Sequence, residues 1–445
     1  MNLVEEIFRG ARRSAPALIA DGAALSYGDL IERAEKMAVR VAQTRAARVG
    51  LDCPNGIEHV IYALGIVRAG KCLVPIASEL APPERARLIL ETGLGAVVDA
   101  AGNVQEAPLS GDLGFPEDAL ARLNPAFIRF SSGTTGRSKG IVLSHERLRE
   151  RIEAANGGLE ITPEDRVVWV LPMAHHFAVS LMLYLAKGAC TVLVRSHLAE
   201  DVLGSARAHG GTVLYGAPFH HALLAAEASG RPWPGLRLAV STAAALPSAT
   251  AQGFDKRFGV PLSQGLGVIE VGLPLLNLRA AREKPGSVGR ALPGYAVRLR
   301  EGELHLRGPG MLDAYLSPWR TAAEICREGW FATGDLGRVD AEGDVFIDGR
   351  AHSVINVAGL KCFPEEVEAV LGEVPGVAQA RVLGRPHPKV GAVPVAQLVP
   401  LDPRCPPSVA DITLRCRERL ARYKVPVEFA FVESLPLTAS GKLRR

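Results

Sequence analysis

The stretch FIRFSSGTTGRSKGIVLSH, residues 127–145, carries the strongest structural signal in the chain. Apolar residues at 127–130 and at 141–143 each predict a short β-strand. Between them lies a loop rich in Gly, Ser and Thr that also contains Lys139. Free backbone N–H groups and hydroxyls in such a loop can bind phosphate oxygens, and a lysine adds a positive charge. We therefore predict a phosphate-binding loop between two strands.

Two common phosphate-binding motifs do not fit this loop. A Walker A motif requires GxxxxGK[ST], but here Ser138 precedes Lys139 and Gly140 follows it. A Rossmann fingerprint requires a helix that begins at its glycines, and no helix signal follows directly. A surface turn without a ligand is the remaining alternative. The length of the pattern and the apolar strand after it make that alternative less favoured.

The sequence SSGTTGRSKG resembles the signature loop of the adenylate-forming superfamily, which includes acyl-CoA synthetases, adenylation domains and firefly-type luciferases. The family usually has proline where this chain has Ser138. The resemblance implies that the loop binds ATP and that Thr134 takes part in catalysis. The residues of the loop that it assigns to ATP are Ser131, Ser132, Gly133, Thr134, Thr135, Gly136 and Lys139.

Composition limits the class of protein. A chain of 445 residues suggests two or three domains, and its net charge of +4 does not imply nucleic-acid binding. The seven cysteines are scattered without a CxxC pair, which favours free thiols over a zinc site or a disulfide framework. The start of the chain lacks a signal-peptide pattern, and the most apolar window, 177–193, is too short to span a bilayer. We expect a cytoplasmic monomer or homodimer without a transmembrane segment.

The first hundred residues alternate between strand and helix signals. Residues 16–30 predict two short strands around Asp21-Gly22 and a helix that starts at Ser26. Further strands are predicted at 48–51, 72–75 and 96–99, with helices at 57–69 and 84–92. This βαβα order predicts a parallel, doubly wound sheet. Residues 166–198 repeat it, as strand 166–171, helix 178–186 and strand 189–194.

The predicted fold class is therefore α/β. A large N-terminal domain, residues 1–348, would hold doubly wound, mostly parallel sheets and a β-barrel-like subdomain. Residues 301–348 are predicted to be mostly β-strand. A small α+β C-terminal domain, residues 349–445, would follow. The resemblance implies that this domain moves about a hinge near 349–352, where His352 stands at the family's pivot position.

The segment LPMAHHFAVS resembles the family stretch that borders the acyl pocket, which makes His175 the candidate acyl-site residue. The alternative is a polar residue at a strand-to-helix junction. No acidic residue lies between Asp165 and Glu200. An amino-acid substrate would require a carboxylate near its ammonium group, because an unpaired buried charge is costly. A simple carboxylic acid is therefore favoured.

Two segments resemble the family's nucleotide site. In LRLAVSTAAALP, residues 236–247, the small residues Ala243 and Ala244 would lie beside the nucleotide. In SQGLGVIEVG, residues 263–272, the family has an aromatic residue, Gly, any residue, Thr and Glu. Glu270 keeps the Mg²⁺ ligand, an oxygen donor that suits this cation. Leu266, next to Gly265, offers a purine only apolar contact, and Ile269 cannot form a side-chain hydrogen bond, so we expect weaker or altered nucleotide binding.

The last third of the chain carries the remaining family motifs. GWFATGDLGRVD resembles the family's ribose-binding stretch, and a carboxylate there, Asp335, can accept both ribose hydroxyls. Arg350 matches an arginine that contacts ribose and phosphate, and Gly359 matches a glycine of the pantetheine tunnel. The tail LPLTASGKLRR matches the motif of the catalytic lysine, here Lys442. The alternative for such a basic tail is a frayed, solvated end.

Taken together, the resemblance implies ATP-dependent activation of a carboxylic acid to an acyl-adenylate, with release of pyrophosphate, and then transfer of the acyl group to coenzyme A. Lys442, His175, Thr134 and Arg350 are the implied catalytic residues, and ATP, Mg²⁺ and coenzyme A are the implied cofactors. The acceptor could instead be the phosphopantetheine arm of an acyl carrier protein. A third possibility is a nucleotide-binding relative that has lost turnover, marked by the changes at Leu266, Ile269 and Asn356, where the family frequently has lysine.

Overall fold

The structure is a computed structural model that describes residues 1–20, 22–78, 80, 82–107, 114–131, 139–357, 360–388 and 391–436. The chain forms two compact units. Unit 1 comprises Met1–Ala296 and Leu306–Phe331, and unit 2 comprises Val297–His305 and Ala332–Arg445. The domain boundary predicted between residues 348 and 349 and the hinge predicted near 349–352 remain predictions.

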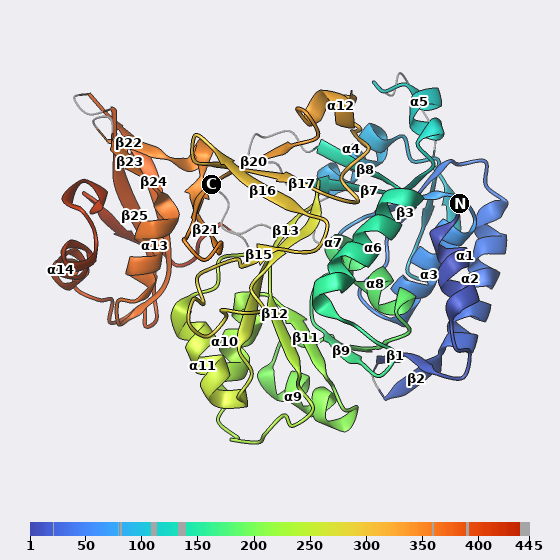
Figure 1. The fold of residues 1–445 in the computed structure, drawn as a ribbon, viewed down its shortest axis with the longest axis horizontal. Coiled ribbons are helices and arrows are strands. Elements are labelled where there is room, and N and C mark those ends of the chain that lie inside the picture. Colours follow the sequence, from blue (N-terminus) through green and yellow to red (C-terminus); the bar gives the residue numbers. More distant parts are fainter. Residues whose placement is uncertain are drawn as a thin grey trace. The chain divides into compact units, whose positions relative to one another are not determined.

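Unit 1 contains two large sheets (Figure 1). The eight-stranded sheet has the order β19-β18-β8-β7-β4-β3-β5-β6. Its inner pairs β3–β4, β3–β5 and β4–β7 are parallel, whereas β7–β8 and β8–β18 are antiparallel. Its strands are β3 Arg48–Leu51, β4 Cys72–Pro75, β5 Ala96–Val98, β6 Val104–Glu106, β7 Pro125–Ser131, β8 Lys139–Ser144, β18 Ala314–Tyr315 and β19 Arg320–Thr321.

The nine-stranded sheet has the order β15-β14-β13-β12-β11-β9-β10-β1-β2. Its centre is parallel, and it ends in antiparallel pairs at both edges. The central strands are mostly apolar and, apart from the half-buried Arg166 at the start of β9, buried, as expected for parallel strands covered on both faces. Its strands are β1 Pro16–Ala20, β2 Ala23–Ser26, β9 Arg166–Trp169, β10 Cys190–Leu193, β11 Val213–Gly216, β12 Leu238–Ser241, β13 Leu262–Val268, β14 Gly272–Leu276 and β15 Arg290–Ala291.

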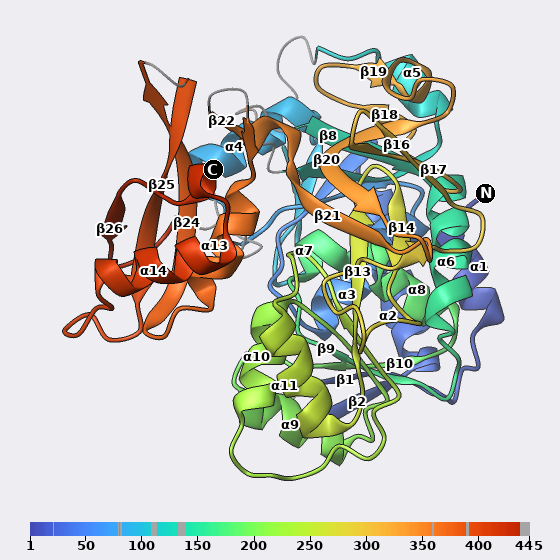
Figure 2. The same ribbon diagram turned by 60° about the vertical axis from the view of Figure 1, so that its left-hand side comes forward.

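Helices cover the faces of these sheets. Figures 1 and 2 show α2, α3, α6 and α8 between the two sheets and α9, α10 and α11 on the far face of the nine-stranded sheet. On that far face Val168 and Leu214 of the sheet belong to one buried cluster with Leu203 and Phe254 of the helices. The helices of unit 1 are α1 Leu3–Gly10, α2 Tyr27–Ala42, α3 Ile57–Arg68, α4 Pro82–Thr92, α5 Glu117–Arg122, α6 His145–Leu159, α7 Met173–His176, α8 Leu181–Ala186, α9 Ala199–Ala208, α10 Pro218–Ala226, α11 Ser248–Phe258 and α12 Ala322–Ile325.

The start of α2 illustrates how local sequence sets an element. The side-chain oxygen of Ser26 accepts the N–H of Asp29 at 3.1 Å, and the Asp29 carboxylate accepts the N–H of Ser26 at 3.1 Å. This capping box satisfies two N–H groups that the helix itself cannot pair. The helix therefore begins at Tyr27, directly after the predicted cap.

One predicted helix differs from the structure. We predict a single helix at 178–186, but α7, a 3₁₀ turn at Phe177–Val179 and α8 occupy this region in succession. The break falls at Ser180, whose backbone lies outside the helical region with φ −133° and ψ −61°. Because nearly every residue here is apolar, periodicity could not locate the break.

In unit 2 a four-stranded sheet has the order β16-β17-β20-β21. The strands predicted within 301–348 lie in this sheet. A second sheet has the order β23-β22-β25-β24, with β26 paired to β25, and α13 and α14 supply Val367, Leu371, Ile412 and Cys416 to its core. The elements are β16 Ala296–Arg300, β17 Glu303–Arg307, β20 Phe331–Val339, β21 Val345–Arg350, β22 Ile355–Val357, β23 Leu360–Cys362, α13 Pro364–Gly372, β24 Val377–His387, β25 Gly391–Pro400, α14 Val409–Arg419 and β26 Phe429–Phe431.

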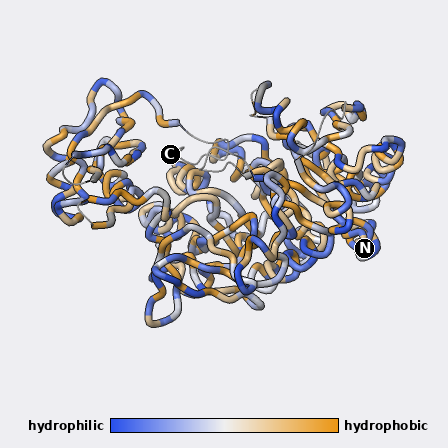
Figure 3. The backbone as a smooth tube through the Cα atoms, turned by 90° about the horizontal axis from the view of Figure 1, so that it is seen from above, coloured by the Kyte–Doolittle hydropathy of each residue, from blue (hydrophilic) through white to orange (hydrophobic). Residues whose placement is uncertain are grey.

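The fold class is thus α/β with mixed sheets and a smaller C-terminal part, as predicted. Hydrophilic and hydrophobic residues are interspersed along the described parts of the chain (Figure 3). Within the described ranges, no helix is long and apolar enough to cross a membrane.

Candidate active site

The predicted phosphate loop connects two strands that pair with each other. β7 and β8 are antiparallel, and Ser131 at the end of β7 is the register partner of Lys139 at the start of β8. The remaining predicted loop residues, Ser132 to Gly136 with Thr134 and Thr135 among them, lie outside the described residues. Gly140 closes the hairpin where a Cβ would come within 2.9 Å of the Phe130 ring and 3.0 Å of Leu316. Glycine is therefore required there by space.

Lys139 and Glu270 both contact the side chain of Tyr315. The Nζ atom of Lys139 lies 4.8 Å from the centre of the Tyr315 ring, a cation–π distance. The hydroxyl of Tyr315 donates a hydrogen bond to Oε1 of Glu270 at 3.1 Å. Burial, followed by the charge of Glu270, raises the pKa of Tyr315, so its hydroxyl remains a donor. No sequence motif indicated Tyr315, which reaches this point because β18 pairs with β8.

Glu270 lies in the turn between β13 and β14. Its carbonyl accepts the N–H of Leu312 at 2.8 Å, and Gly272 at φ +117° completes the turn. The described residues contain no group of three or more His, Cys, Asp or Glu side chains that could hold a metal ion. A single carboxylate still fits Mg²⁺, because this cation is commonly bound by one or two carboxylates together with substrate phosphates and water.

The small-residue segment at 242–247 follows β12, and β12 pairs with β13. A Cβ on Gly267 would lie 3.7 Å from Oγ1 of Thr242, so the two predicted nucleotide segments are neighbours. Ala243 has φ +75°, in the left-handed region that disfavours residues with a Cβ, and Ala244 is exposed. Gly265 and Leu266 pair with Leu276 and Leu275 of β14, respectively. The structure thus brings the segment of Ala243 and Ala244 close to that of Gly265 and Leu266.

His175 lies in α7, which is anchored to the loop before α3. The amide oxygen of Asn55 accepts the N–H of Met173 at 2.9 Å. The carbonyl of His175 accepts a hydrogen bond from Nη1 of Arg129, a β7 residue that the sequence did not single out. Burial, followed by the nearby charge of Arg129, lowers the pKa of His175 to about 4. His175 is therefore neutral at physiological pH.

Unit 2 holds a second group of predicted residues. Asp335 and Arg350 are register partners on β20 and β21, and Nε of Arg350 lies 2.7 Å from Oδ1 of Asp335. Asp335 is buried, whereas Arg350 is exposed. His352 follows in a 3₁₀ turn at Ala351–Ser353. Gly359 and Lys442 lie outside the described residues.

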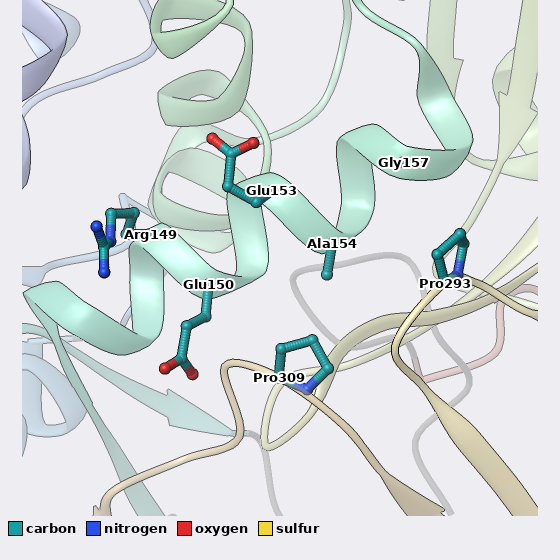
Figure 4. A pocket seen from close by; sticks show the side chains of 7 residues that line it. All are labelled: Arg149, Glu150, Glu153, Ala154, Gly157, Pro293 and Pro309. Atoms are coloured by element: carbon teal, nitrogen blue, oxygen red, sulfur yellow. The ribbon is translucent and has the colours of Figure 1, made fainter.

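A separate hollow of about 560 Å³ lies beside α6. Figure 4 shows that Ala154 and Glu150 of α6 point toward the loops of Pro293 and Pro309, whereas Arg149 and Glu153 point elsewhere. Oε2 of Glu150 accepts the N–H of Gly310 in one of these loops at 2.8 Å. None of the residues that line this hollow is a predicted site residue.

The chain belongs to the AMP-binding enzyme family, whose sequence model matches residues 7–316, while that of the AMP-binding enzyme C-terminal domain matches residues 366–442. It is therefore a member of the adenylate-forming superfamily, as predicted.

Similar proteins agree with this assignment. Indoleacetate–CoA ligase of Aromatoleum aromaticum is 28% identical over 471 residues, which cover 95% of this chain and 92% of the relative. The 2-succinylbenzoate–CoA ligase of Listeria monocytogenes serotype 4b is 31% identical over 325 residues, covering 72% of this chain and 68% of the relative. The o-succinylbenzoate CoA synthetase MenE of Bacillus subtilis, in complex with its acyl-adenylate intermediate, has a TM-score of 0.87 and 26% identity, covering 100% of this chain and 97% of that structure.

Proposed function

We propose that this enzyme activates a carboxylic acid with ATP, releases pyrophosphate and transfers the acyl group to the thiol of coenzyme A. The observation that carries the proposal is the connection of Lys139 through Tyr315 to Glu270, which joins the predicted phosphate loop to the predicted metal ligand. The family membership and the CoA ligases among the relatives support it.

In the first half-reaction an oxygen of the carboxylate attacks the α-phosphate, and the bond to pyrophosphate breaks. Negative charge gathers on the phosphate oxygens, so the enzyme has to supply cations and oriented donors. We assign Thr134, Thr135 and Lys139 to the departing pyrophosphate and Lys442 to the α-phosphate. Glu270 would hold Mg²⁺, which when bound offsets phosphate charge.

Two groups of residues are assigned to the nucleoside. Asp335 can accept the ribose hydroxyls, and its ion pair with Arg350 holds the carboxylate in one orientation. We assign Ala243, Ala244, Gly265 and Leu266 to the adenine side. Without an aromatic residue at 266 the purine face receives only aliphatic contact, which is why we expect weak nucleotide affinity.

The second half-reaction needs a thiol in place of pyrophosphate. We assign the segment of Gly359 to the pantetheine arm and His352 to a hinge that would exchange this segment with Lys442 between the two steps. The phosphopantetheine of a carrier protein is the alternative acceptor. A cytoplasmic location and a monomeric or homodimeric state remain parts of this proposal.

ATP–pyrophosphate exchange tests the proposal. The enzyme would be assayed without any thiol against short, medium, long and aromatic carboxylic acids and against amino acids. We expect exchange with one class of carboxylic acid and none with amino acids. Addition of coenzyme A or of a carrier protein then identifies the acceptor. If ATP binds but no acid supports exchange, the proposed activity is wrong and the alternative of a nucleotide-binding protein without turnover takes its place.

A further inference from the structure

Arg129 is an unusual residue for its position in the sheet. It lies in the middle of β7, a strand with paired neighbours on both sides, and its register partner on β8 is Ile141. Side chains two residues apart in a strand point to the same face, so Arg129 shares its face with Phe127, which is 2% exposed. An apolar side chain would suit the packing of this face. Packing alone therefore does not explain an arginine at this position, and we look for a charged group that it could bind.

Not all hydrogen-bond donors of the Arg129 guanidinium have an acceptor among the described residues. Nη1 donates to the carbonyl of His175, whereas Nε is buried without a hydrogen-bond partner among the described residues. Nε2 of His175 is likewise buried without a hydrogen-bond partner among the described residues. Arg129 as a whole is half-buried, but an unmade hydrogen bond at its buried Nε atom is costly, and desolvation lowers the pKa of Arg129 to about 10. Within the described chain, no carboxylate forms an ion pair with Arg129, although the charge of Glu270 opposes this decrease.

Arg129 lies where three parts of the predicted site meet. Two residues further along β7 the predicted phosphate loop begins at Ser131. The hydrogen bond to His175 connects Arg129 to the predicted acyl segment, and its charge interacts with that of Glu270, the predicted metal ligand. If the proposed function holds, the reacting carboxylate must lie between the acyl segment and the α-phosphate. That carboxylate has to approach a triphosphate of the same sign of charge.

We propose that Arg129 binds the reacting carboxylate of the acid substrate during the first half-reaction. This inference rests on the function proposed above. The ion pair would provide the missing acceptor for the guanidinium, hold the carboxylate oxygen toward the α-phosphate and reduce the repulsion between the two anions. Because every acid substrate carries the reacting carboxylate, Arg129 contributes to the affinity for acids in general. The neutral His175 beside it contributes no competing positive charge.

The chain offers a matched control in Arg151 of α6. Arg151 is buried, whereas Arg129 is half-buried; the Nη1 and Nη2 atoms of Arg151 have no partner among the described residues, and its pKa is likewise lowered to about 10. Its Nε atom donates to the carbonyl of Gly310, which belongs to neither the predicted acyl segment nor the phosphate loop. The charge of Arg151 interacts with that of Glu270 as well, so the two arginines differ in that only Arg129 contacts the predicted acyl segment.

The experiment measures acid binding separately from turnover. Wild type, Arg129→Met, Arg129→Lys and Arg151→Met would be titrated with ATP alone, and then with acetate, benzoate, octanoate and succinate in the presence of a non-hydrolysable ATP analogue and Mg²⁺. Thermal unfolding verifies that each variant is folded. We expect Arg129→Met to weaken binding of monocarboxylic and dicarboxylic acids alike by about tenfold or more, with ATP affinity changed less than about twofold. We expect Arg129→Lys to retain part of the affinity and Arg151→Met to retain all of it.

Each other result overturns the inference in a distinguishable way. If wild type binds acids and supports pyrophosphate exchange but Arg129→Met binds them equally well, the inference fails and the proposed function stands. Loss confined to succinate would mean that Arg129 binds a second carboxylate and not the reacting one. Equal losses in Arg129→Met and Arg151→Met would indicate a structural role. If no acid binds wild type, the inference and the proposed function fail together.

Discussion

Asp335 and Arg350 face each other across β20 and β21, and Nε of Arg350 lies 2.7 Å from Oδ1 of Asp335. The Asp335 side chain is 5% exposed, whereas that of Arg350 is 51% exposed. The carboxylate is therefore held in place by its strand, while the guanidinium could reorient when a ligand arrives. This asymmetry suits a site in which Asp335 binds ribose and Arg350 shares its charge with phosphate.

We predict that Asp335→Asn weakens ATP binding by about tenfold, because a neutral amide accepts hydrogen bonds from two ribose hydroxyls less strongly than a carboxylate. Isothermal titration with ATP measures the change. A matched control is Arg338→Gln, which removes the exposed ion pair of Arg338 with Asp348 on the same two strands and should leave ATP affinity unchanged. Equal affinities of Asp335→Asn and wild type would remove Asp335 from the ribose site.

We predict that Ala243→Gly stabilises the protein by about 0.5–1 kcal/mol. Ala243 has φ +75°, and a left-handed conformation costs a residue with a Cβ about 1–2 kcal/mol, part of which the greater freedom of glycine in the unfolded chain offsets. Urea unfolding of the variant measures the difference. The control is Ala244→Gly. Ala244 is not among the residues with positive φ, so this substitution should destabilise the protein. Stabilisation of both variants, or of neither, would contradict the strain at Ala243.

The sequence predicted those features that depend on neighbours along the chain. The strands on either side of the phosphate loop follow from short apolar runs, and the start of α2 follows from the capping residue Ser26. The family motifs, which occur along this chain in the order that the family has, identified Glu270, Asp335 and Arg350 as candidate site residues. In each case the signal lies within a few residues of the feature it predicts.

Features that depend on strand register could not be predicted in this way. Tyr315 reaches Glu270 only because β18 pairs with β8, whose residues precede it by more than 170 positions. Arg129 contacts the carbonyl of a residue 46 positions away, and an arginine within a short apolar run gives no sign of which face of the sheet it occupies. Likewise, motif order did not reveal that Asp335 and Arg350 are direct register partners.

We predict that Ile269→Thr tightens binding of ATP in the presence of Mg²⁺ by a few-fold. Ile269 precedes Glu270 in the turn after β13, where the family usually has threonine, and a hydroxyl would add a phosphate donor worth about 0.5–1.5 kcal/mol. Titration with and without Mg²⁺ measures the effect. Val268→Thr adds the same hydroxyl one residue earlier and should change nothing. Unchanged affinity in Ile269→Thr would mean that this position does not limit nucleotide binding.

We predict that Glu368→Gln stabilises unit 2 at pH 8 and flattens its dependence on pH. Burial raises the pKa of Glu368 from 4.5 to about 7, despite the hydrogen bond that its carboxylate accepts from the N–H of Val382. The folded state therefore binds a proton more tightly than the unfolded chain does, so this residue makes stability fall as pH rises from about 4.5 to about 7. The total loss is at most about 3 kcal/mol. Glutamine cannot ionise and keeps an oxygen that can accept the Val382 N–H.

Denaturant unfolding at pH 5 and pH 8 measures this effect. Wild type should lose more free energy of unfolding between the two values than Glu368→Gln does. Glu373→Gln is the control, because Glu373 is exposed at the end of the same helix, α13, and its removal should leave the pH dependence as in wild type. If Glu368→Gln and wild type lose the same free energy of unfolding, the carboxyl of Glu368 is already ionised without cost, and its surroundings are more polar than the contacts of α13 with β24 imply.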